Sequence, residues 1–85
     1  MLRSVAIFHN GDRYVGRVRN ISSGGAMIEG LWNVPAETQF SIELAVGMTV
    51  EAVTRWSVDD RMGVQFTQAI DVRTVQSAAP IKMAS

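Results

Sequence analysis

The strongest constraint on the fold is an alternation of apolar and polar residues with a period of two. It is clearest at residues 39–44, where Phe40, Ile42 and Leu44 alternate with polar neighbours. Because successive side chains of a β-strand point to opposite faces, this pattern predicts a strand with one buried face. Comparable segments predict five more short strands, at about residues 5–8, 13–21, 26–28, 49–56 and 62–66.

Turn residues separate the predicted strands. Asn10 and Gly11 are a strong hairpin signal between the first two strands, and Asp59 and Asp60 predict a turn before the last one. Residues 22–25 (Ser-Ser-Gly-Gly) predict another turn, because glycine supplies positive φ and serine hydroxyls satisfy nearby backbone groups. Six short strands with little helix favour an all-β fold, a small six-stranded antiparallel β-barrel, because closure removes exposed strand edges.

The length of the chain predicts a single domain. Its 85 residues leave no room for a second core. We expect residues 1–67 to form the barrel and residues 68–85 to form a C-terminal helix or tail. A helix within residues 68–79 would end at Pro80, and its apolar spacing at Ile70 and Val75 is poor.

Composition excludes several classes of protein. The chain has no cysteine and a single histidine, so disulfides, thiolate metal sites and histidine clusters are ruled out and no metal or cofactor is expected. Eight basic residues balance eight acidic ones, so we do not expect the protein to bind duplex nucleic acid. No apolar run reaches the length of a membrane span or resembles a secretory signal, so we expect a cytoplasmic protein without a membrane partner.

The charges are unevenly distributed along the chain. Residues 1–30 contain four arginines against two acids, whereas residues 31–60 contain five acids against one arginine. The four N-terminal arginines are Arg3, Arg13, Arg17 and Arg19. A binding site for an anion is therefore expected near the N-terminal strands.

The sequence contains no recognisable set of catalytic residues. His9 precedes a turn and has no second histidine to act with. Asp59 and Asp60 are adjacent, so their side chains point apart. Ser22 and Ser23 have no histidine close in sequence and no nucleophile elbow around them. We therefore do not expect an enzyme.

The turn at residues 22–25 allows binding chemistry instead. Its two glycines let a ligand approach backbone N–H groups, which can hold anionic oxygens. Short turns of serine and glycine are common in β proteins that bind nothing, so without further context a plain hairpin connection is the better interpretation.

Asn20, Ser22 and Gly25 form an (Asp/Asn)-x-Ser-x-x-Gly pattern at the end of the second predicted strand. This pattern resembles the motif that ends the second strand in the PilZ domain family. Residues 53–56 (Val-Thr-Arg-Trp) and 61–66 (Arg-Met-Gly-Val-Gln-Phe) resemble the family's closing strand pair. The resemblance covers about residues 5–66 and implies a PilZ-like barrel that binds the bacterial second messenger cyclic di-GMP.

The resemblance also implies a role for each matching residue. Asn20 would bind a guanine edge, Ser22 would contact base or phosphate, and Gly25 would let the nucleotide approach. Paired arginines of the family bind phosphate and guanine bidentately, and Arg3 is the arginine nearest to their expected position. Trp56 would stack on a base, although the alternation of residues 49–56 places it with the apolar core face, the commoner role of such a tryptophan.

The chain departs from the family pattern at the arginine pair. The family has arginine-x-x-x-arginine before or at its first strand, where this chain has Arg3 alone. Arg13 and Arg17 have the right spacing, but alternation puts them on the face opposite Asn20, and only a bulge could bring them together. The pair either precedes Met1 in a longer natural protein, or the chain is a degenerate member.

Three functions follow from these observations. The first is a cyclic di-GMP receptor module in bacterial signalling. The second is a degenerate PilZ-like scaffold that acts through a protein partner, a companion domain or self-association. The third is a barrel that resembles the oligonucleotide-binding fold and binds single-stranded nucleic acid. Tyr14, Trp56 and the arginine-bearing face of the second predicted strand favour this function, and the zero net charge disfavours it.

Overall fold

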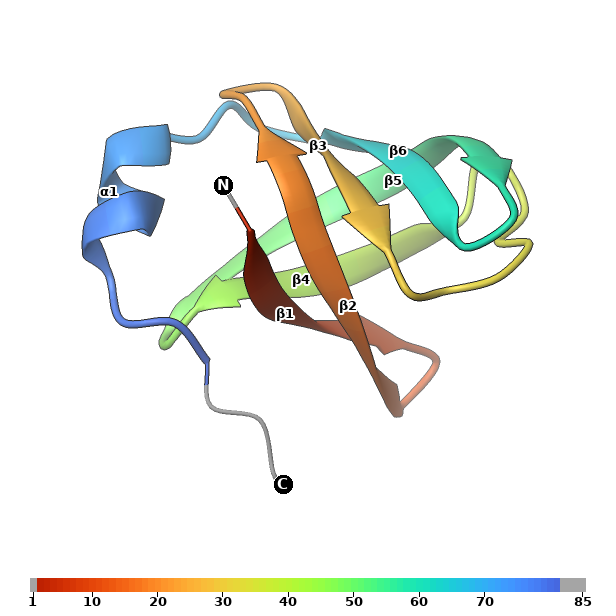
Figure 1. The fold of residues 1–85 in the computed structure, drawn as a ribbon, viewed down its shortest axis with the longest axis horizontal. Helices are drawn as coiled ribbons and strands as arrows, with labels where there is room; N and C mark the ends of the chain where they lie inside the picture. Colours follow the sequence, from red (N-terminus) through yellow and green to blue (C-terminus); the bar gives the residue numbers. More distant parts are fainter. Residues whose placement is uncertain (1, 82–85) are drawn as a thin grey trace.

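The computed structural model describes residues 2–81, which form six strands and one short helix (Figure 1). In chain order the elements are β1 (Arg3–His9), β2 (Asp12–Ile21), β3 (Gly25–Glu29), β4 (Gln39–Ala45), β5 (Met48–Val58), β6 (Arg61–Phe66) and α1 (Val72–Ser77).

The six strands form a closed antiparallel barrel. Their order around it is β1-β2-β3-β6-β5-β4, and β4 pairs back with β1 to close the ring. Every pairing between neighbours is antiparallel. The predicted fold, an all-β six-stranded antiparallel barrel with a short C-terminal helix, is confirmed.

The apolar face of the alternation fills the interior of the barrel. Phe40, Ile42 and Leu44 are all buried in one hydrophobic cluster, as their spacing predicts. Every strand contributes to this cluster, and its largest fully buried side chains include Ile7, Ile28, Ile42, Leu44 and Met62. The interior is thus a packed core, and a ligand as large as a nucleotide must bind outside it.

Strand β2 contains a bulge near its end. Its pairing with β3 shifts register between Val18 and Asn20, so Arg19 is an extra residue. Such a residue moves the side chains after it to the other face of the strand. Ile21 therefore packs against the core, and Asn20 is exposed on the outside, as Arg17 is. The prediction that Asn20 and Arg17 lie on opposite faces is wrong, because it assumed unbroken alternation.

Strand β5 contains a bulge of the same kind. Its pairing with β6 shifts register between Thr54 and Trp56, which makes Arg55 the extra residue. Thr54 is fully buried, but Trp56 is 45% exposed on the outside of the barrel. The prediction that Trp56 shares the buried face of Ala52 and Thr54 is wrong for the same physical reason.

Helix α1 packs against the end of the barrel where β1 begins. The helix is shorter than the predicted segment of residues 68–79. Asp71 caps its N-terminus, because the Asp71 Oδ1 accepts a hydrogen bond from the Arg73 N–H at 3.0 Å. Val75 is buried in the core cluster, and its carbonyl oxygen accepts a bond of 2.6 Å from Arg3 Nη1. Within residues 2–81, no helix is long and apolar enough to cross a membrane.

The core predicts a sharp difference between two aliphatic substitutions. Ile42→Ala removes a fully buried side chain, and we expect it to lower the free energy of unfolding by about 2–5 kcal/mol. Val58→Ala, at a position that is 62% exposed, should change it by less than about 0.5 kcal/mol. Urea unfolding of the two variants measures both values, and equal losses would contradict the described core.

Candidate functional site

A shallow hollow lies on the outside of the barrel, where β3, β5 and β6 meet the end of β2. Its volume is about 490 Å³. The side chains and backbone that line it come from Asn20, Ile21, Ser22, Gly25, Ala26, Met27, Arg55, Trp56, Gly63 and Val64. We call it the outer-face hollow.

Four of the five predicted site residues line this hollow together. Asn20 and Ser22 come from the end of β2 and the turn after it, Gly25 starts β3, and Trp56 lies on β5. The bulge in β2 puts Asn20 on the outside, and the bulge in β5 does the same for Trp56. Arg3, the fifth, is not among the lining residues.

The turn at residues 22–25 is fixed by backbone hydrogen bonds on both sides. The Ser22 N–H donates to the Gly25 carbonyl at 2.8 Å, which closes the turn. The carbonyl of Gly24 accepts from the Phe66 N–H at 2.9 Å, and that of Ser23 from the Ile70 N–H at 2.9 Å. The motif is therefore anchored to the end of β6 and to the connection into α1, which presents Ser22 to the hollow in a defined position.

Gly25 is required by close packing rather than by its backbone angles. Neither Gly24 nor Gly25 has a positive φ, so the prediction that the turn needs one is wrong. A Cβ atom on Gly25 would collide with the carbonyl oxygen of Val64 on the neighbouring strand, whereas a Cβ on Gly24 would meet nothing within 4 Å. The motif's glycine thus permits β3 to approach β6.

The Trp56 ring packs closely against a glycine on the neighbouring strand β6. Trp56 is paired with Gly63, and a Cβ on Gly63 would collide with the indole ring. After the bulge, Ser57 follows with its hydroxyl buried and, among residues 2–81, without a hydrogen-bond partner. An exposed tryptophan beside a buried, unpaired hydroxyl breaks the usual rule for burial, and such exceptions are expected at functional sites.

Among the residues that the structure describes, Arg55 is the one with a charged side chain that lines the outer-face hollow, and sequence reasoning did not include it in the site. Its Nε donates to Gln65 Oε1 at 2.8 Å, and its Nη1 lies 3.0 and 2.8 Å from the two carboxylate oxygens of Glu37. Its position next to Trp56 in the sequence was the available signal. Alternation alone could not place both side chains on the same surface.

Two further arginines, on β2 and β6, share an acid on β3. Arg19 Nη1 lies 3.2 Å from Glu29 Oε1, and Arg61 Nε lies 3.5 Å from Glu29 Oε2. Both arginine side chains are exposed, whereas the Glu29 side chain is 17% exposed. The arginines keep positive charge on β2 and β6, on either side of β3.

The remaining arginines predicted for an anion site lie elsewhere. Arg3 is partly buried, and it binds the Val75 carbonyl at the C-terminal end of α1, where a cation is favoured by the helix dipole. Arg17 lines a separate hollow with Glu29 and Asp60. Arg13 is exposed, near the β1–β2 turn.

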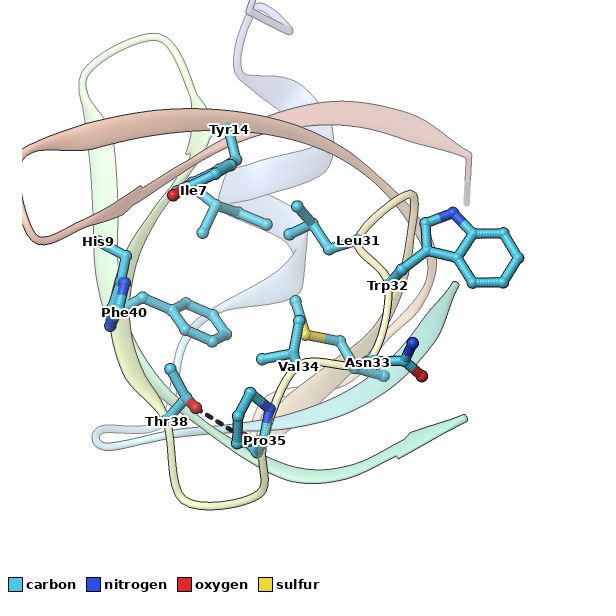
Figure 2. Close-up of a pocket in the computed structure, with 11 residues that line it drawn as sticks. Ile7, His9, Tyr14, Leu31, Trp32, Asn33, Val34, Pro35, Thr38 and Phe40 are labelled. Carbon is cyan, nitrogen blue, oxygen red and sulfur yellow. Dashed lines mark hydrogen bonds between the residues drawn. The ribbon is translucent and has the colours of Figure 1, made fainter. Parts of the chain in front are cut away.

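A second hollow occupies the end of the barrel where β1 finishes (Figure 2). It measures about 340 Å³ and has an apolar floor that includes Ile7, Phe40 and Met62. The loop of residues 30–38 covers part of it, with Leu31 and Val34 pointing inward and Trp32 pointing away (Figure 2). No arginine is among its lining residues in the described part of the chain. The outer-face hollow, which Arg55 lines, therefore differs from this one in having a cationic side chain.

Comparison with known families agrees with this fold. The sequence model of the PilZ domain matches residues 1–79, and the chain belongs to the PilZ domain family, a family of binding modules. Neither the curated proteins nor the solved structures contain a match to the chain. Residues 2–81 hold no group of three or more histidine, aspartate and glutamate side chains able to bind a metal ion.

The contact between Gly25 and Val64 predicts different effects for two adjacent glycines. Gly25→Ala forces a methyl group against a backbone carbonyl, and we expect a loss of about 1–3 kcal/mol in the free energy of unfolding. Gly24→Ala enters open space and should change it by less than about 0.5 kcal/mol. Thermal unfolding compares them directly, and a Gly25→Ala protein as stable as the parent would refute the described strand approach.

Proposed function

We propose that this PilZ domain is a cyclic di-GMP receptor module of bacterial signalling, and that the nucleotide binds in the outer-face hollow. The observation that carries the proposal is the convergence of Asn20, Ser22, Gly25 and Trp56 on one surface, although Trp56 is 31 residues from Gly25 in the chain. The family resemblance supplies the identity of the ligand. As a receptor for this messenger, the protein would work in the bacterial cytoplasm and would catalyse no reaction.

Each lining residue has chemistry that suits part of the nucleotide. The Asn20 amide and the Ser22 hydroxyl can bond polar edges of guanine or phosphate oxygens. The exposed Trp56 ring is a surface on which a base can stack, a contact worth about 1–3 kcal/mol per base. The Arg55 guanidinium matches two adjacent acceptors, as found on phosphate or on guanine O6 and N7.

Asn20 sets an expectation for affinity. A carboxylate offers two acceptor oxygens to the donor edge of guanine, whereas the Asn20 amide offers one. Members of the family that carry aspartate at this position should therefore bind more tightly than this chain. Asn20→Asp is the matching substitution, and it should strengthen binding.

Calorimetric titration with cyclic di-GMP tests the proposal. We expect saturable binding, weakened about threefold to tenfold by Ser22→Ala or Asn20→Ala, the effect of losing one hydrogen bond. Ser41→Ala is the matched control, because Ser41 lies on β4 and bonds only the exposed Glu51 side chain. Absence of saturable binding, or an equal loss in the control, would rule the site out.

A second candidate function is a degenerate scaffold that acts through a protein partner, a companion domain or self-association. The observation in its favour is that Arg3, the arginine predicted for the site, and Arg55, the arginine found in the hollow, both have partners within the chain. Arg3 binds the Val75 carbonyl, and Arg55 binds Glu37 and Gln65. Sedimentation and pull-down of the protein without nucleotide test this function, and a strictly monomeric chain that captures no partner would count against it.

A further inference from the structure

Glu37 forms an ion pair with Arg55, the arginine that lines the outer-face hollow. It belongs to the loop of residues 30–38 and has φ of 69°, a left-handed conformation uncommon for glutamate. Its N–H donates to the Thr54 carbonyl at 2.7 Å, and the Thr54 N–H donates to the Thr38 carbonyl at 2.9 Å. These two bonds attach the loop to β5 immediately before the Arg55 bulge, so the Glu37 carboxylate is delivered to Arg55 by backbone geometry.

The Arg55 guanidinium is oriented by hydrogen bonds to Gln65 and Glu37, but one of its three nitrogens is left for another acceptor. Nε binds Gln65, and Nη1 alone serves both oxygens of Glu37. Among the contacts of residues 2–81, Nη2 has no acceptor. A guanidinium forms its strongest pairs when two nitrogens each donate to a separate oxygen. A ligand with two adjacent acceptors could make such a pair, which the Glu37 carboxylate does not make.

The pair between Glu37 and Arg55 is weak enough to be exchanged. The side chains are 69% and 49% exposed, and an exposed ion pair changes an equilibrium by about fivefold at most. A phosphodiester competing for the same guanidinium brings two acceptors and a charge, and the bound base adds stacking on Trp56. Exchange of the carboxylate for the ligand is therefore expected, at a moderate cost in affinity.

We propose that Glu37 is a built-in competitor at the nucleotide site. It occupies Arg55 and is displaced by a ligand group with two adjacent hydrogen-bond acceptors, such as a phosphodiester. Glu37 thus determines both affinity and specificity, because a ligand with one acceptor cannot improve on the carboxylate. The inference rests on the proposed function for the identity of the nucleotide, but the exchange at Arg55 applies to any anion of this geometry.

Calorimetry and NMR with two ligands test the exchange. Cyclic di-GMP and inorganic pyrophosphate are titrated into the parent protein and into Glu37→Gln, which removes the charge and keeps the size. We expect Glu37→Gln to bind both ligands about threefold to fivefold more tightly, the factor set by an exposed pair. The Arg55 Nε–Hε resonance, identified by its loss in Arg55→Lys, should shift on titration in both proteins.

Two controls separate this effect from a change in net charge or in folding. Glu51→Gln removes the same charge from β5, where the carboxylate bonds Ser41 instead of an arginine, and should leave both affinities unchanged at physiological salt. Glu37→Gly removes the whole side chain and suits the left-handed backbone, so it should fold and should also bind more tightly.

The outcomes distinguish the inference from the proposed function. If Glu37→Gln and Glu37→Gly leave the affinity for cyclic di-GMP unchanged, the inference that Glu37 is a competitor is overturned, and the proposed receptor function is unaffected. A pyrophosphate response at Arg55 that tightens in both Glu37 variants, without any cyclic di-GMP binding, supports the competitor and overturns the receptor. Equal tightening in Glu51→Gln, or no response to either ligand, overturns the competitor.

Discussion

The close approach of β3 to β6 is the constraint on which the rest of the structure depends. Closure of the barrel requires β3 to pair with β2 on one side and with β6 on the other. At the first residue of β3 there is no space for a side chain, because the Val64 carbonyl fills it. Gly25 meets that requirement. The same residue ends the turn that carries Ser22, so the geometry that closes the barrel also builds the outer-face hollow.

Two bulges, in β2 and β5, place side chains of the candidate site on the outside of the closed barrel. The first exposes Asn20 and keeps Ile21 in the core, and the second exposes Trp56. The second has a cost, since the buried Ser57 hydroxyl lacks a partner among the described residues, a loss of about 1–3 kcal/mol. The indole ring thus stays at the surface of the barrel beside Gly63 in spite of this cost.

Much of the fold could be predicted from the sequence because its signals are local. Alternation marked the strands, Asn10 and Gly11 marked the first hairpin, and the spacing of Asn20, Ser22 and Gly25 marked the lining of the hollow. Local signals could not reveal features that arise when distant segments pair.

The face of Trp56 depends on the absence of a side chain at Gly63, on another strand. Arg3 reaches a carbonyl 72 residues away, and Glu37 meets Arg55 through a loop without regular structure. The motif residues of the candidate site, Asn20, Ser22 and Gly25, could thus be predicted from the sequence, but its arginine, Arg55, could not. An arginine is the extra residue in the bulge of β2 (Arg19) and in the bulge of β5 (Arg55), and its deletion differs from its replacement. Replacement removes the charge and keeps the bulge. Deletion would instead join Val18 directly to Asn20, or Thr54 to Trp56, and would leave each of these residues on the face that it has now, so the number of residues in the strand, and not the arginine side chain, sets which side chains face outward.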